Sequence, residues 1–364
     1  MFSDFKVENS MKNILVLGGT GAMGKHLVQI LVDKGNKLSV TTRREQPEDG
    51  NIEYIQGNAK DSGFLQTLMI RHWDVIVDFM VYTTPVFAQR IPVMLAATNQ
   101  YIFLSSARVY ADSIEPIKED SARLLDASKD SDFLATDEYC LAKARQENLL
   151  AQSSRNNWTV IRPYITYSEQ RLQLGVLEKE EWLYRALKGR TIVFSKDIDS
   201  KLTTMTYGLD VAYAMASLIG EERAQGEVYH ITQSRPVTWE KILDIYQAVL
   251  EKHLGTKPKL LLLDLNKFSR CKRKAEFQIK YDRLFDRSFD STKIGNFVRV
   301  DSFVTLEDGL RRCIEEFLKS PEFLSIDWRS EATKDRFCSE VANLSEIVHW
   351  KQKLKYFIYR FIAP

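Results

Sequence analysis

The stretch that decides the fold reads NILVLGGTGAMG and occupies residues 13–24. Its first part, Asn13–Leu17, is mostly aliphatic and predicts a short buried parallel strand. Glycines follow, and residues 22–34 then repeat apolar side chains at helical spacing. In such a unit the glycines let the backbone approach a pyrophosphate, and the helix N-terminus presents free N–H groups to it. The stretch therefore predicts a dinucleotide site formed by Gly18, Thr20, Gly21, Ala22, Met23 and Gly24.

Short apolar segments alternate with helical segments as far as about residue 170. The predicted strands lie at 38–42, 52–56, 75–79, 101–104 and 159–162, and the predicted helices at 64–71, 85–98 and 136–153. This alternation is typical of a parallel sheet that helices cover on both faces. After residue 170 helical patterns dominate, at 174–187, 209–219, 239–254, 306–318 and 332–361, with short strands at 192–194 and 228–231.

These patterns predict an α/β protein, a Rossmann-type doubly wound parallel sheet with a smaller, mostly helical C-terminal substrate domain. We expect the dinucleotide-binding domain to span residues 11–170, with returning segments at about 191–235. The substrate domain would comprise 171–190 and 236–330, and residues 331–364 would form an amphipathic helical tail.

Composition excludes several classes of protein. The chain has 51 Lys and Arg against 49 Asp and Glu, so its net charge of +2 gives no general affinity for nucleic acid. The four cysteines are scattered without a CxxC pair and the five histidines are dispersed, so we expect neither a metal site nor a disulfide framework. The N-terminus has no apolar signal core and no apolar run is long enough to span a membrane. We therefore expect a cytoplasmic protein.

The end of the second strand bears on the choice of dinucleotide. An acid there favours NAD, whereas an arginine favours the 2′-phosphate of NADP. This chain reads Thr41-Thr42-Arg43-Arg44, and the first acid is Glu45. NADP is therefore favoured over NAD, with Arg43 as the contact to the 2′-phosphate.

Two further motifs carry chemistry. Tyr139 and Lys143 lie four residues apart on a predicted helix, so the phenol and the ammonium share one face. A cation next to a tyrosine stabilises its phenolate and allows proton transfer near neutral pH. The sequence SSARVY at 105–110 directly follows a predicted strand, which puts Ser106 at the ligand-binding edge of the sheet.

In this order, the motifs GGTGAMG, SSARVY, YCLAK and RPYI (residues 162–165) resemble those of the extended short-chain dehydrogenase/reductases, in the NAD-dependent epimerase/dehydratase family. The resemblance implies that Tyr139 is the catalytic acid/base, that Lys143 contacts the nicotinamide ribose and that Ser106 orients the substrate. It places Asn58 and Ala59 at the adenine. It also implies a nucleotide-sugar substrate and a homodimer.

Departures from the family pattern narrow the activity. Ala107 and Arg108 stand where the resembling dehydratases carry acids, which argues against water elimination. An epimerase and a reductase of a keto-sugar or related ketone remain, and we rank the epimerase slightly ahead, although the arginines at 43 and 44 lean towards an NADPH-dependent reductase. A third reading is a catalytically retired protein that senses NADP(H) and regulates a partner.

Two regions yield less specific expectations. Arg171 and Arg185 are candidates for holding a pyrophosphate, and Tyr167 or Trp182 for stacking on a base. In the tail, apolar residues at helical spacing alternate with cations: Trp350, Leu354, Phe357, Ile358, Phe361 and Ile362 with Lys351, Lys353, Lys355 and Arg360. We expect residues 345–364 to pack on protein, with peripheral contact to an anionic membrane as the alternative.

Overall fold

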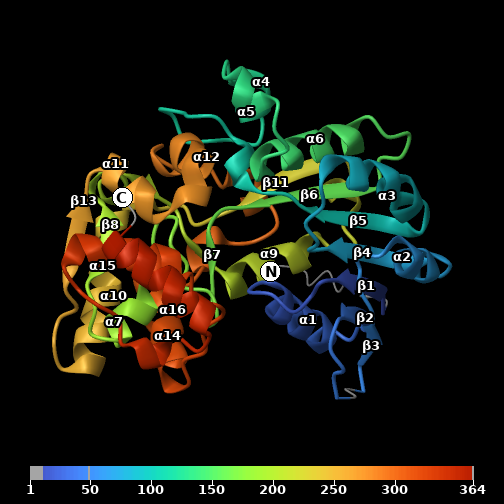
Figure 1. Cartoon of the computed structure of the whole chain (residues 1–364). Helices are drawn as coiled ribbons and strands as arrows, with labels where there is room; N and C mark the ends of the chain where they lie inside the picture. The colour runs from blue at the N-terminus through green and yellow to red at the C-terminus, as the bar shows by residue number, and fades with distance from the viewer. Residues whose placement is uncertain (1–10, 48–49, 363–364) are drawn as a thin grey trace, which may run out of the picture.

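The centre of the computed structural model, which describes residues 11–47 and 50–362, is a seven-stranded sheet (Figure 1). All of its strand pairs are parallel, in the order β11-β6-β5-β4-β1-β2-β3. The strands are β1 (Asn13–Leu17), β2 (Lys37–Thr42), β3 (Ile52–Gln56), β4 (Trp73–Asp78), β5 (Thr98–Leu104), β6 (Trp158–Pro163) and β11 (Glu227–Ile231). Successive strands are added on one side from β1 to β3 and on the other side from β4 to β11, so the strand order reverses between β1 and β4. Proteins of the α/β class bind ligands beside such a reversal.

Helices cover both faces of this sheet, as the alternating pattern predicts. On one face lie α1 (Gly24–Asp33) and α9 (Gly208–Leu218), which pack on each other and on the sheet. On the other face lie α2 (Ser62–Met69), α3 (Thr84–Ala96) and α6 (Tyr139–Ala151) (Figure 1). Helix α1 follows the predicted spacing, because Leu27, Ile30 and Leu31 point into the core. The predicted Rossmann-type fold is thus confirmed.

The C-terminal region lies beside one end of the sheet (Figure 1). Its main helices are α7 (Leu183–Leu187), α10 (Trp239–Leu254), α11 (Leu265–Cys271), α14 (Leu306–Lys319), α15 (Trp328–Cys338) and α16 (Trp350–Phe357). Further short elements of the chain, which belong to both regions, are α4 (Leu124–Ala127), α5 (Ser131–Leu134), β7 (Thr166–Tyr167), α8 (Lys196–Asp199), β9 (Leu202–Thr203), β10 (Thr206–Tyr207), β12 (Val237–Thr238), α12 (Glu276–Gln278) and α13 (Thr292–Gly295). A single apolar core joins this region to the carboxyl end of β6.

Three expectations about this region are wrong. β8 (Ile192–Ser195) is predicted to return to the dinucleotide-binding domain, but it pairs with β13 (Leu260–Leu263) in a separate sheet. The chain returns to the central sheet only later, with α9 packed on the sheet and β11 paired within it. The predicted helix 174–187 begins only at Leu183, because Gly175, at φ +58°, lies in a tight turn closed by a bridge between Leu174 and Leu177. The predicted helix 332–361 is two helices, since the chain leaves α15 at Ser339 with φ +56°.

A buried ion cluster fixes α15 to the core. The Arg185 side chain on α7 is fully buried, and its Nη1 lies 2.9 Å from a carboxylate oxygen of Glu331 and 2.7 Å from one of Asp335. Its Nη2 lies 3.2 Å from Glu340. Arg190 adds a contact of 3.3 Å to Asp335. Residues 331–340 are therefore part of the folded core and not a detached tail.

This cluster makes Arg185 a stability determinant. We expect Arg185→Met to lower the free energy of unfolding by about 3–5 kcal/mol, because it leaves buried carboxylates short of positive charge. Urea denaturation followed by circular dichroism measures the loss. Arg311→Met is the matched control: its exposed pair with Glu307 predicts a change below about 1 kcal/mol. Equal losses in the two variants would contradict the role given to the cluster.

Candidate active site

The glycine loop joins β1 to α1 in a form that only glycine permits at two positions. Gly18 has φ +77°, in the left-handed region, and its N–H donates to the Thr41 hydroxyl at 3.1 Å. A Cβ atom on Gly24 would come within 2.6 Å of the Gly19 backbone carbon. The loop and the start of α1 therefore lie close together, with the first N–H groups of α1 at the carboxyl end of β1.

A cavity of about 320 Å³ opens beside this loop, at the carboxyl ends of β1, β2 and β3. It brings together five of the residues predicted to bind the cofactor: Gly18, Thr20, Arg43, Asn58 and Ala59. The described residues that line it also include Thr41, Thr42, Gly57, Lys60 and Met80, and none of them is acidic. The polar and cationic lining suits the adenosine end of a dinucleotide. Arg43 and Lys60 are the cations that an additional phosphate on the ribose could contact.

Arg90 on α3 holds the rim of this cavity and escaped the sequence analysis. Its side chain is buried, and its Nη1 donates to the carbonyl of Ala59 at 2.8 Å while its Nη2 donates to that of Lys60. Asn58 accepts from the Lys60 N–H at 3.1 Å and completes the turn. The sequence does contain a sign that Arg90 is buried, because it shares one helix face with the apolar Phe87 and Met94.

Ser106, Tyr139 and Lys143 come from adjoining elements at the carboxyl end of β5. Ser106 caps a short 3-10 turn, Ala107–Val109, by accepting from the Arg108 N–H at 3.2 Å. Tyr139 is the first residue of α6, and Lys143 follows one turn later. The Lys143 ammonium donates to the carbonyl of Leu104 at 2.7 Å and lies 5.9 Å from the centre of the Tyr139 ring.

Burial and charge set the protonation of Lys143. Burial lowers the pKa of Lys143 to about 8, while the carboxylates of Asp78 and Glu147 act in the opposite direction. The ammonium is thus mostly charged at neutral pH. Asp78 is a further residue that the sequence analysis missed, although an acid ending an apolar strand was a visible signal. It is fully buried and accepts from the Tyr101 hydroxyl at 2.7 Å.

A second cation, Arg108, lies against Tyr139. Its guanidinium carbon is 5.4 Å from the centre of the Tyr139 ring, and the side chain is held by Glu138 at 2.9 Å and Asp282 at 3.7 Å. Burial raises the pKa of Tyr139, and the Arg108 charge, followed by the Ser106 hydroxyl and Arg171, lowers it. The sequence analysis used Arg108 only to note that no acid stands at this position. In the structure it is a cation placed beside the Tyr139 ring.

A second cavity, of about 600 Å³, lies on the other side of the glycine loop. It is lined by Thr20, Gly21, Ala22, Lys25 and His26, by Ser168, Glu169, Gln170 and Arg171, and by Glu178, Lys179, Glu180 and Leu324. Arg171, one of the predicted substrate contacts, is half-exposed here and lies 3.5 Å from Glu178. The charge of Arg171 also lowers the pKa of Tyr139, less than that of Arg108 does.

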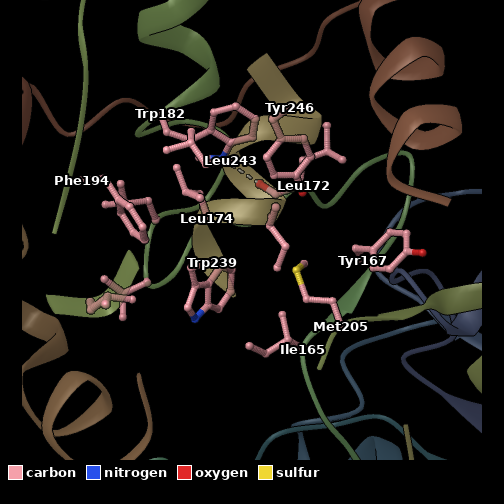
Figure 2. Close-up of a cluster of buried hydrophobic side chains, with 14 of the residues drawn as sticks. Ile165, Tyr167, Leu172, Leu174, Trp182, Phe194, Met205, Trp239, Leu243 and Tyr246 are labelled. Carbon is pink, nitrogen blue, oxygen red and sulfur yellow. Dashed lines mark hydrogen bonds between the residues drawn. The ribbon is translucent and has the colours of Figure 1, made fainter. Parts of the chain in front are cut away.

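Three other predicted substrate contacts are wrong, because their side chains are fully buried and line neither cavity. Figure 2 shows two of them, Trp182 and Tyr167, within a cluster of apolar side chains. Trp182 stacks on Tyr246 with ring centres 4.5 Å apart and donates to the carbonyl of Leu172. Tyr167 stacks on Tyr207 within the same core. Arg185 belongs to the ion cluster described above. All three stabilise the C-terminal region.

Similarity to known proteins supports the same assignment of the fold. Residues 18–192 match the family model described as NAD(P)H-binding. The chain is 28% identical over 253 residues to the chloroplast stem-loop binding protein of 41 kDa b of Arabidopsis thaliana, a match that covers 64% of this chain and only 61% of that protein. It is 21% identical over 335 residues to a UDP-N-acetyl-alpha-D-glucosaminuronate decarboxylase of Bacillus cytotoxicus, covering 84% of this chain and 98% of that protein.

Among solved structures, the UDP-glucuronic acid 4-epimerase from Bacillus cereus in complex with UDP-glucuronic acid and NAD superposes with a TM-score of 0.63 at 17% identity. The superposition covers 84% of this chain and 99% of the epimerase. Residues 18–192 thus resemble NAD(P)H-binding proteins in sequence, and the chain as a whole has the fold of this NAD-dependent epimerase.

Proposed function

We propose that this chain is an NAD(P)-dependent epimerase of a nucleotide sugar, with Tyr139 as the acid/base. The observation that carries the proposal is the placement of Ser106, Tyr139 and Lys143 at the carboxyl end of β5, on the same edge of the parallel sheet as the glycine loop. Two of the similar proteins named above act on or bind UDP-linked uronic sugars by their names, which supports a sugar-nucleotide substrate.

In the proposed reaction the Tyr139 phenolate takes the proton from a sugar hydroxyl whose oxygen the Ser106 hydroxyl holds. The glycine loop, Arg43, Asn58 and Lys143 would hold the dinucleotide, whose nicotinamide would supply reversible hydride transfer at the sugar carbon. Tyr139 then gives its proton back to the sugar oxygen, so the net reaction inverts one carbon. Arg108 and Lys143 stabilise the phenolate between the two proton transfers.

The test is turnover of a panel of UDP- and dTDP-sugars, with the epimer detected by NMR. We expect Tyr139→Phe to lower the rate roughly 10²–10⁴-fold, because it removes the proton carrier, and to leave the affinity for NAD(P)H unchanged. Tyr213→Phe, at an exposed tyrosine on α9, is the matched control and should keep full activity. Cofactor binding without turnover of any sugar would instead support a regulatory sensor.

Arg108 gives a prediction about pH dependence. Its charge lowers the pKa of Tyr139, so Arg108→Met should raise that pKa and move the rising limb of the pH–rate profile to higher pH. At neutral pH we expect a rate loss of about tenfold. Arg108→Lys keeps the charge and should restore most of the lost rate. A pH profile that does not move in Arg108→Met would show that Arg108 only supports the structure.

A reductase is the second candidate, and the adenosine cavity favours it. Arg43 and Lys60 line this cavity and no acid is found among its described lining residues, a composition that suits the 2′-phosphate of NADPH.

Arg43→Ala tests this reading of the cavity. We expect it to weaken NADPH binding about 10- to 100-fold, as the loss of a charge-assisted hydrogen bond predicts, and to change NADH binding little. Nicotinamide fluorescence titrations measure both affinities. Arg44→Ala is the control, because Arg44 does not line the cavity. Equal affinity of the unaltered protein for NADH and NADPH would contradict the role given to Arg43.

A nucleic-acid ligand, which the name of the chloroplast relative suggests for that protein, has less support in this chain. The most basic segment, residues 267–283, has several of its cations in ion pairs: Lys267 with Asp264, Lys272 with Glu181, Lys280 with Asp130 and Arg283 with Asp282. Such pairing reduces the charge available to phosphates.

A further inference from the structure

The segment that follows α15 is anchored to the protein along one side. Within it, α16 runs into a π-helical turn, Ile358–Ile362. Tyr356 is buried, and its hydroxyl donates to Asp335 at 2.6 Å and accepts from the Ala342 N–H at 2.7 Å. The Arg329 guanidinium lies 4.2 Å from the centre of the Tyr359 ring. The helix is therefore held at a fixed orientation relative to α15.

The opposite side of this helix carries an apolar stripe. Trp350, Leu354, Phe357 and Phe361 follow one another at intervals of four, three and four residues, which places them along one face. Each is at least half-exposed, with Trp350 at 68%. Ile362, which follows the stripe in sequence, is as exposed as Trp350. Of the expected contacts, on this domain or on a second subunit, the first is made only by the Tyr356 side of the helix and not by the stripe.

Cations border the stripe on both sides. At 100° per residue, Lys351 and Lys355 fall on one side of it and Lys353 on the other, and all three are exposed. The sequence has no Asp or Glu after Glu346. Long lysine stems can lie along an apolar surface while their ammonium groups reach outward to anions.

We propose that the stripe formed by Trp350, Leu354, Phe357 and Phe361, with its flanking lysines, docks this protein on an anionic lipid membrane. The charge favours anionic headgroups, and the aromatic side chains suit the boundary between headgroups and acyl chains. In the part of the chain that the structure describes, no helix is long and apolar enough to cross a membrane, so the contact is with one membrane face. The proposal does not depend on the proposed epimerase activity.

Trp350 provides a direct optical test. All six tryptophans lie within the described residues; Trp350 is exposed and the other five are buried: Trp73, Trp158, Trp182, Trp239 and Trp328. With vesicles of phosphatidylcholine and phosphatidylserine we expect a blue shift of the fluorescence and quenching by brominated lipid. Vesicles of phosphatidylcholine alone should give neither change. Trp350→Phe should abolish the signal while sedimentation with the anionic vesicles persists.

Two sets of variants separate the apolar and the charged contributions. Leu354→Ser, Phe357→Ser and Phe361→Ser combined should abolish sedimentation with anionic vesicles. Ile70→Ser, Val93→Ser and Ile114→Ser combined, at exposed apolar positions elsewhere, are the control and should leave it intact. Changing Lys351, Lys353 and Lys355 to Glu should weaken binding at least roughly 100-fold, and the same change at the exposed Lys252, Lys257 and Lys259 should not.

Added salt should weaken binding of the unaltered protein, since part of the attraction is electrostatic. Unchanged sedimentation of the serine variant would overturn the proposal, as would the absence of binding to anionic vesicles. Light scattering supplies another decisive outcome: a dimer of the unaltered protein that becomes monomeric in the serine variant would show that a second copy covers the stripe. NADPH titration of each variant keeps a failure of the active site distinguishable, because residues 350–361 line neither cavity.

Discussion

The arrangement of the site depends on one buried carboxylate, that of Glu147 on α6. It accepts from the Ser105 hydroxyl at 2.5 Å and from two nitrogens of Arg162 at 2.8 and 2.7 Å. Tyr139, Lys143 and Glu147 are spaced four residues apart, so they lie along one face of the same helix. Any sliding of α6 against β5 and β6 would break charge-assisted hydrogen bonds in a buried setting, which is costly. Glu147 therefore fixes Tyr139 and Lys143 relative to the sheet.

Two cations of different character flank Tyr139. Lys143 is buried, with a pKa of about 8, and can lose its charge under mildly alkaline conditions. Arg108 is held by ion pairs with Glu138 and Asp282. Of the two cations, Lys143 is thus tied to the end of β5 through the Leu104 carbonyl, whereas Arg108 is tied to two carboxylates beside the Tyr139 ring. A chain with an acid at position 108 would present the opposite charge to the same phenol.

Local patterns were sufficient for the sheet and for the glycine loop, because an apolar strand, a glycine turn and an amphipathic helix are all encoded by neighbours in sequence. The roles of Trp182 and Arg185 could not be read in this way. An arginine reads as an exposed cation unless its partners are known, and Glu331 lies 146 residues further along the chain. Likewise, β8 has the same apolar pattern whichever sheet it joins, and only its pairing with β13 decides its place.

The ion cluster around Arg185 also has a consequence for the order in which this protein can fold. During synthesis α7 leaves the ribosome long before α15, because about 150 residues separate Arg185 from Asp335. Until residues 331–340 emerge, Arg185 and Arg190 lack the acids that neutralise them in the folded chain. Burying these two arginines without the acids would carry a large free-energy cost. The nucleotide domain can form as soon as its own strands are complete, whereas the core of the C-terminal region has to wait until α15 has been synthesised.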